Sequence, residues 1–206
     1  MKAVFRALLL LIGMAIVTGG VAAYTVASRG LSTRVQPSAV ETWMAHAMRW
    51  LATPASVRRA VNPVEATPEV LEDGLAHFAD HCATCHANDG SGDTPMGRSF
   101  YPPAPDMRVP RTQQLTDGEL FSIIENGIRL TGMPAWGTGT PEGEHASWGL
   151  VRFIRRLPSL SADDIARMET MNPRSPDVFR QEEDARRFLA GEDVPARQEP
   201  APAHAH

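Results

Sequence analysis

The stretch FADHCATCH, residues 78–86, holds both cysteines of the chain and decides its fold. Cys82 and Cys85 are three positions apart, and His86 follows the second thiol directly. The pattern C-x-x-C-H is typical of covalent haem attachment. The two thiols can form thioethers with the vinyl groups on one porphyrin edge, and the imidazole then lies beneath the ring, where it can bind iron. We therefore predict one covalent haem c on Cys82 and Cys85, with His86 as an iron ligand.

Two other uses of a cysteine pair fit the sequence less well. A disulfide or a redox-active dithiol can occupy C-x-x-C, but the thioredoxin type needs a strand–turn–helix setting, which the flanking residues do not predict. A structural zinc site needs four ligands. The chain has no second cysteine pair, and no H-x3-5-H tract lies at the distance from the cysteines that a zinc finger requires.

An uncharged apolar run, ALLLLIGMAIVTGGVAAYTVA, occupies residues 7–27 behind Lys2 and Arg6. As a helix rising 1.5 Å per residue, these 21 residues are long enough to cross a bilayer core. The two basic residues predict a cytoplasmic N-terminus and an exported remainder. The alternative is a cleaved signal peptide, for which residues 21–23 are a passable cleavage site. The run is longer than the usual core of a signal peptide, which favours an uncleaved anchor.

The composition limits the remaining classes of function. A length of 206 residues leaves room for one compact domain with extensions. The 17 prolines and 16 glycines suit a helical domain with long irregular loops. The formal net charge of −4 provides no basic surface for nucleic acid, so no nucleic-acid partner is expected.

The pattern beyond residue 66 predicts helices. Thr67-Pro68-Glu69 combines an N-cap, a first-turn proline and an acid at the positive end of the dipole, so a helix should run from here to about His81. Capping boxes and apolar spacing predict further helices at 116–127, 144–157 and 161–171. The Gly- and Pro-rich segment 87–115 should be a long loop without helices, packed on the haem.

The segment between the apolar run and this domain has helical spacing. In AVETWMAHAMRWL, residues 39–51, apolar side chains recur every three or four positions. Two interpretations fit equally well. The helix can pack on the main domain, or it can lie on the membrane surface with Trp43 and Trp50 at headgroup level. Residues 53–65, with two prolines, are expected to be a linker.

The iron needs a second axial ligand opposite His86. Met133 lies in TGMPAW, residues 131–136, between two predicted helices. Pro134 disfavours helical geometry at Met133, and Gly132 allows the backbone to approach the ring closely. Met133 is therefore the preferred thioether ligand, although methionine also commonly fills gaps in a core. Met107 is the reserve candidate and His145 a weaker one, whereas Met168 and Met171 are expected beyond the core.

These motifs together resemble the membrane-anchored bacterial mono-haem c-type cytochromes with a His/Met-ligated iron. The resemblance covers roughly residues 66–160 and implies a small all-α cytochrome c fold, three to five helices around a covalent haem, behind an N-terminal transmembrane helix. It also implies that Gly74 meets Trp148 or Phe153 where the first and last helices cross. A proline carbonyl should accept a hydrogen bond from His86, a contact that orients such a ligand. Pro105 fits best, and Pro103 is possible.

The resemblance implies a division of the chain and a role for it. Residues 1–28 would be the membrane anchor or an uncleaved signal, 29–65 a juxtamembrane helix and linker, 66–160 the cytochrome c domain, and 161–206 a short helix with a mobile polar tail. The expected function is single-electron transfer between periplasmic or membrane redox partners, by a carrier rather than an enzyme. The protein would cross the bacterial inner membrane once, with the haem domain in the periplasm. The alternatives are a haem-bearing subunit of a respiratory oxidoreductase complex and a ligand-binding or sensing cytochrome with a labile sixth ligand.

Overall fold

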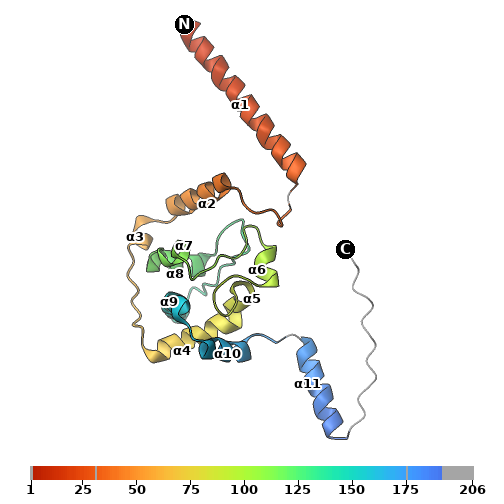
Figure 1. Cartoon of the computed structure of the whole chain (residues 1–206). Helices are drawn as coiled ribbons and strands as arrows, with labels where there is room; N and C mark the ends of the chain where they lie inside the picture. The colour runs from red at the N-terminus through yellow and green to blue at the C-terminus, as the bar shows by residue number, and fades with distance from the viewer. Residues whose placement is uncertain (1, 31, 175, 192–206) are drawn as a thin grey trace.

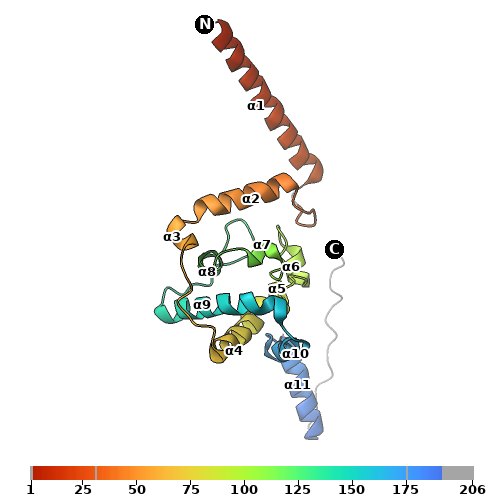
Figure 2. The same ribbon diagram turned by 60° about the vertical axis from the view of Figure 1, so that its left-hand side comes forward.

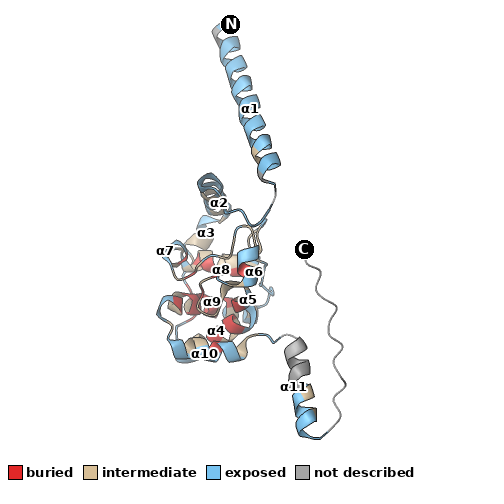
Figure 3. Ribbon diagram, turned by 45° about the vertical axis from the view of Figure 1, so that its right-hand side comes forward, coloured by how far each residue is buried: buried red, intermediate tan, exposed pale blue. Residues whose placement is uncertain are grey.

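The computed structural model describes residues 2–30, 32–174 and 176–191, and every regular element in these ranges is helical. Helix α1 (Lys2–Arg29) projects away from the rest, with its apolar side chains exposed along its length (Figures 1 and 3). The other helices, apart from α11 at the C-terminal end, gather around one hydrophobic core. The predicted all-α cytochrome c fold with an N-terminal apolar helix is confirmed.

The haem motif lies at the end of a long helical segment rather than after it. Helix α4 (Pro68–His77) begins where the sequence predicts, with the Thr67 side chain accepting a hydrogen bond from the Val70 amide. It continues through a π-helical turn, η1 (Phe78–Cys82), into α5 (Ala83–His86). The predicted end near His81 was therefore too early. The helical segment carries both cysteines and the histidine on a rigid support.

Helix α4 crosses α9 (Pro141–Arg156) at the centre of the domain (Figure 2). A Cβ atom added to Gly74 would lie 2.8 Å from the Phe153 Cβ and 3.3 Å from the Gly149 carbonyl oxygen. This confirms the predicted glycine–aromatic crossing and identifies Phe153 as the partner. Trp148 instead stacks on Phe121 of α8 (Asp117–Asn126), with 4.1 Å between the ring centroids.

The segment 87–115 is more structured than predicted. It contains two short helices, α6 (Pro95–Ser99) and α7 (Pro110–Gln113), each with a proline in its first turn. The prediction of a helix-free loop was wrong because proline at a first helical position promotes a helix as readily as it ends one. Helix α9 likewise begins before the predicted residue 144, since Thr140 caps it and Pro141 occupies its first turn.

Residues 53–65 are attached to the domain rather than forming a free linker. Helix α3 (Ala55–Arg58) follows α2 (Ala39–Ala52), and a Cβ atom on Gly118 of α8 would lie only 1.9 Å from the Val57 carbonyl oxygen. Asn62 is buried and donates to the Trp148 carbonyl oxygen at 2.9 Å. Arg152 of α9 donates to the Val64 carbonyl oxygen at 2.7 Å. Residues 53–65 therefore pack on α8 and α9 and connect α2 to them.

The C-terminal side also differs from expectation. After the 3-10 turn η2 (Leu157–Ser159), α10 (Ala162–Met171) folds back onto η1. Its Met168 is 0% exposed and belongs to the core, so the expectation that Met168 lies beyond the core was wrong. Helix α11 (Pro176–Leu189) follows within the predicted tail, of which residues 175 and 192–206 lie outside the described residues.

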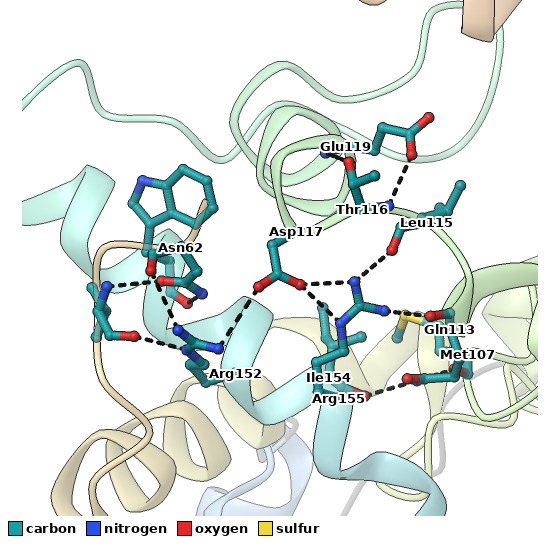
Figure 4. A network of polar contacts seen from close by, with 12 residues as sticks. Asn62, Met107, Gln113, Leu115, Thr116, Asp117, Glu119, Arg152, Ile154 and Arg155 are labelled. Atoms are coloured by element: carbon teal, nitrogen blue, oxygen red, sulfur yellow. Dashed lines mark hydrogen bonds and ion pairs between the residues drawn. The ribbon is translucent and has the colours of Figure 1, made fainter. Parts of the chain in front are cut away.

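A polar network fastens α9 to the beginning of α8 (Figure 4). Arg155 donates two hydrogen bonds to the Asp117 carboxylate, at 2.8 and 3.0 Å, and one to the Gln113 carbonyl oxygen at 2.6 Å. Gln113 in turn donates to the Met107 and Ile154 carbonyl oxygens at 2.7 and 2.9 Å. The network therefore ties the segment that follows Pro105 to the central helices.

Candidate haem site

The two thiols lie one helical turn apart at the end of the continuous helical segment. Both are free in the structure, and both are partly buried. Burial, reinforced by the neighbouring Cys85, raises the pKa of the Cys82 thiol to about 12, and burial raises the pKa of Cys85 as well. A redox-active pair needs a thiol of lowered pKa. The environment therefore argues against a disulfide-exchange site and leaves two protonated thiols held by rigid backbone.

His86 occupies the last position of α5 and points inward. Its Nδ1 atom is buried and makes no hydrogen bond of good geometry within the described residues. Burial lowers the pKa of His86, while the nearby Pro105 carbonyl acts in the opposite direction. The Pro105 carbonyl therefore lies beside the His86 imidazole. The sequence-predicted pair His86 and Pro105 is thus brought together, with a neutral imidazole beside a carbonyl acceptor.

The loop after His86 folds closely around the motif, which brings Pro105 into place. The Gly92 amide donates to the His86 carbonyl oxygen at 2.8 Å, and the Thr94 hydroxyl donates to the Cys85 carbonyl oxygen at 3.2 Å. A Cβ atom on Gly97 would lie 2.2 Å from that same Cys85 oxygen. Only a residue without a side chain fits there, so the glycines of this loop permit its close contact with the motif.

An arginine fastens the two ends of this loop. Arg108 donates two hydrogen bonds to the Asp106 carboxylate, at 2.8 and 2.9 Å, and one to Asp89 at 2.6 Å. The hydrogen bonds from Arg108 lower the pKa of Asp106. Sequence reasoning missed this support, as it missed Gly92 and Gly97. The only local signal was the density of Gly, Asp and Pro in the segment, which does not identify pairs.

Met133 lies in an ordered loop on the C-terminal end of α8. Gly127 has φ +63°, and a Cβ atom there would lie 2.7 Å from the Met133 carbonyl oxygen. That oxygen accepts a hydrogen bond from the Ile128 amide at 3.1 Å, and the Met133 amide donates to the Thr131 hydroxyl at 3.1 Å. A Cβ atom added to Gly132 would lie 2.5 Å from the Phe100 ring. The absence of a side chain at Gly132 therefore lets the backbone approach this ring closely.

The reserve ligands occupy different environments. Met107 is 7% exposed and packs within the hydrophobic core, whereas Met133 is half-buried and outside the core cluster. His145 is exposed on α9 and lines a cleft between α4 and α9, to which Cys82, Cys85 and His86 contribute nothing. Of the two methionines, Met133 is the one whose side chain has no role in the core.

The comparisons with known proteins agree with this geometry. Residues 69–154 match the family model described as cytochrome C oxidase, cbb3-type, subunit III. Residues 69–154 form a c-type cytochrome domain. The search of curated proteins gave no match to the chain. Within the residues that the structure describes, one helix, Val4–Ser28, is long and apolar enough to cross a membrane.

The residues present fit a haem. The domain offers two free thiols on one turn, an imidazole at its end beside the Pro105 carbonyl, and a buried Nδ1 atom that has no hydrogen-bond partner within the described residues. An imidazole with one nitrogen directed at a carbonyl presents its other nitrogen to a metal in a fixed orientation. This donor set matches the chemistry of a c-type haem better than that of a zinc or disulfide site.

Proposed function

We propose that the cytochrome transfers single electrons through one haem c, joined to Cys82 and Cys85 and ligated axially by His86 and Met133. One observation carries this proposal. The turn from Cys82 to His86 is enclosed by a loop that sets the Pro105 carbonyl beside His86. This turn lies within a domain that matches a cytochrome c family. When bound, such a haem cycles its iron between two oxidation states, and thioether ligation favours the reduced one.

The chain's own residues would hold the iron without leaving a coordination position for substrate. Helix α5 fixes His86, the Pro105 carbonyl orients its imidazole, and the end of α8 fixes the loop of Met133. A closed position suits an electron carrier that docks transiently with redox partner proteins, since interfaces of this kind are small. It does not suit an enzyme that must bind a second reactant at iron.

Membrane attachment and topology are further parts of the proposal. Helix α1 exposes apolar side chains along its length, as a helix in lipid does. We infer that it anchors the cytochrome in the bacterial inner membrane by a single span. Because haem is joined to c-type apoproteins outside the cytoplasm, the haem domain would face the periplasm.

A second candidate function is a haem-bearing subunit of a respiratory oxidase, and the description of the matched family favours it. The same site would then relay electrons inside a complex. Extraction of the cytochrome from native membranes in a mild detergent discriminates between the two. A free carrier migrates alone, whereas a subunit is recovered with partner subunits in fixed ratio.

The test of the site begins with covalent attachment and then separates the methionines. Denatured, acid-extracted protein should keep its pigment. Oxidised protein should show the weak far-red band of sulfur-ligated ferric iron, and Met133→Ala should lose it. Met107→Leu is the matched control, because it keeps the core volume and should keep the band. Loss of the band in Met107→Leu alone would show that the ligand assignment is wrong. Rapid carbon monoxide binding by the unmodified reduced protein would favour an open site.

A further inference from the structure

Helix α2 has two faces of opposite character, and the apolar one is largely exposed in the described part of the chain. Six large apolar side chains of this 14-residue helix are between 49% and 73% exposed. They are Val40, Trp43, Met44, Met48, Trp50 and Leu51. At 100° per residue they form one continuous stripe along the helix. An exposed apolar stripe of this length is unusual on a soluble surface and indicates a partner.

The opposite face of α2 contacts the cytochrome domain. Glu41 accepts a hydrogen bond from the Tyr101 hydroxyl at 3.0 Å, in the same loop that carries Pro105. Partial burial and the nearby Arg111 of α7 lower the pKa of His46. The helix therefore turns its polar face to the haem domain and its apolar face away from it.

The position of α2 in the chain identifies what covers its apolar face. Residues 30–38 alone separate it from α1, and fully extended they span about 30 Å. Figures 1 and 2 show α2 across the end of the domain nearest α1. A helix this close to the end of a transmembrane span lies within reach of the headgroup region.

Charge and aromatic content favour the same partner. Residues 30–60 contain four arginines and a single carboxylate, Glu41, although the whole chain has a net charge of −4. Arginines attract this segment to anionic lipid headgroups. The guanidinium of Arg58 lies 4.5 Å from the centre of the Trp50 ring. Tryptophan and arginine together are typical of side chains that sit at headgroup level.

We propose that the apolar face of α2 lies in the outer surface of the bilayer and fixes the orientation of the haem domain relative to the membrane. This proposal rests on the membrane anchor inferred above, since α1 brings α2 to the lipid. The segment after α2 makes the attachment rigid, because α3 packs on α8 at Gly118 and Arg152 binds the Val64 carbonyl oxygen. The membrane would thereby control which side of the domain remains available to redox partners.

The test uses full-length holoprotein in vesicles of phosphatidylethanolamine and phosphatidylglycerol, with spin labels on Met48→Cys and His46→Cys. Both positions are exposed, but Met48 lies in the apolar stripe and His46, two residues away, lies on the opposite side of the helix. We expect collisions with an aqueous nickel chelate to be lost at position 48 and kept at position 46, while oxygen reaches both labels. Unchanged absorption spectra show that both variants retain the folded domain.

The other outcomes overturn the proposal in distinguishable ways. If the chelate reaches position 48 as readily as position 46 while the protein resists alkaline extraction from the vesicles, the anchor stands and the surface helix is refuted. If position 48 is closed to both chelate and oxygen, protein covers the stripe instead of lipid. If alkaline carbonate releases the protein, the anchor itself fails and the surface helix with it.

Discussion

The crossing of α4 and α9 makes a quantitative prediction, because two glycines face the same contact with different amounts of space. Gly74→Ala would place a Cβ atom 2.8 Å from the Phe153 Cβ, well inside the separation of about 3.5–4.0 Å at which two carbons touch. Gly149→Ala would bring its Cβ no closer than 3.6 Å to Val70 Cγ1, an ordinary contact. The two variants should therefore change stability in opposite directions.

The magnitudes follow from two opposing contributions. Overpacking a close-packed core costs about 1–3 kcal/mol, and replacing a helical glycine by alanine gains about 1 kcal/mol. Gly74→Ala should thus lower the free energy of unfolding by up to about 2 kcal/mol, and Gly149→Ala should raise it by about 1 kcal/mol. Truncating Phe153 to alanine should not relieve the first variant, because the Cβ atom that causes the clash remains.

The assay is guanidinium unfolding of the oxidised holoprotein in detergent, followed by circular dichroism and by the Soret band. A midpoint for Gly74→Ala at or above that of the unmodified protein would refute the reasoning. So would shifts of both variants in the same direction and of equal size, because the two helices would then not meet as the structure shows. The far-red band should persist in both variants, since neither residue contacts His86 or Met133.

Three further predictions concern the surroundings of the site. Arg155→Met should lower the free energy of unfolding by about 2–3 kcal/mol, because it removes charge-assisted hydrogen bonds to Asp117, and both side chains are about three-quarters buried. Arg155→Lys should cost less stability. An unchanged melting temperature for Arg155→Met would contradict this. Ala87 has φ 60° and ψ 157°, a conformation that favours glycine. Ala87→Gly should therefore stabilise the protein by about 1 kcal/mol in denaturant titration, and destabilisation would show that no strain resides there. Met168→Ala should lower the free energy of unfolding by about 2–5 kcal/mol in the same titration. The Met96 side chain is 48% exposed, so Met96→Ala should cost less than about 0.5 kcal/mol. Equal effects of the two substitutions would place Met168 outside the core.

The parts of the fold that sequence predicted well depend on local interactions. Thr67, Thr116 and Ser161 each accept a hydrogen bond from a backbone amide three residues later, and each begins a helix where its pattern indicates. Capping involves only neighbouring residues, so the same contact forms whatever packs around it. The glycine–aromatic crossing was predictable for another reason, because the resemblance to c-type cytochromes implies that Gly74 meets Trp148 or Phe153, and the structure shows Phe153.

The parts that sequence missed depend on distant partners. Nothing local distinguishes Gly97 from other loop glycines, because its role is to let the chain pass the Cys85 carbonyl oxygen. Met168 was misplaced because the turn at residues 157–160, which returns α10 to η1, is specified by packing rather than by a capping motif. The π-helical turn before Cys85 is likewise a change of register that residue pattern does not reveal.

The two halves of the proposed site are therefore specified in different ways. The histidine half is compact in sequence, since residues 82–107 contain the thiols, the imidazole, the glycines and the proline, and the loop bonds back onto the helix that precedes it. The methionine half depends on α8, whose last turn receives the amide of Trp136 at the Ile124 carbonyl oxygen at 2.9 Å. These halves meet through the packed helices between them and at the contact of Gly132 with the Phe100 ring. Local sequence therefore points to each proposed ligand, but the position of Met133 relative to His86 depends on the core formed by α4, α8 and α9.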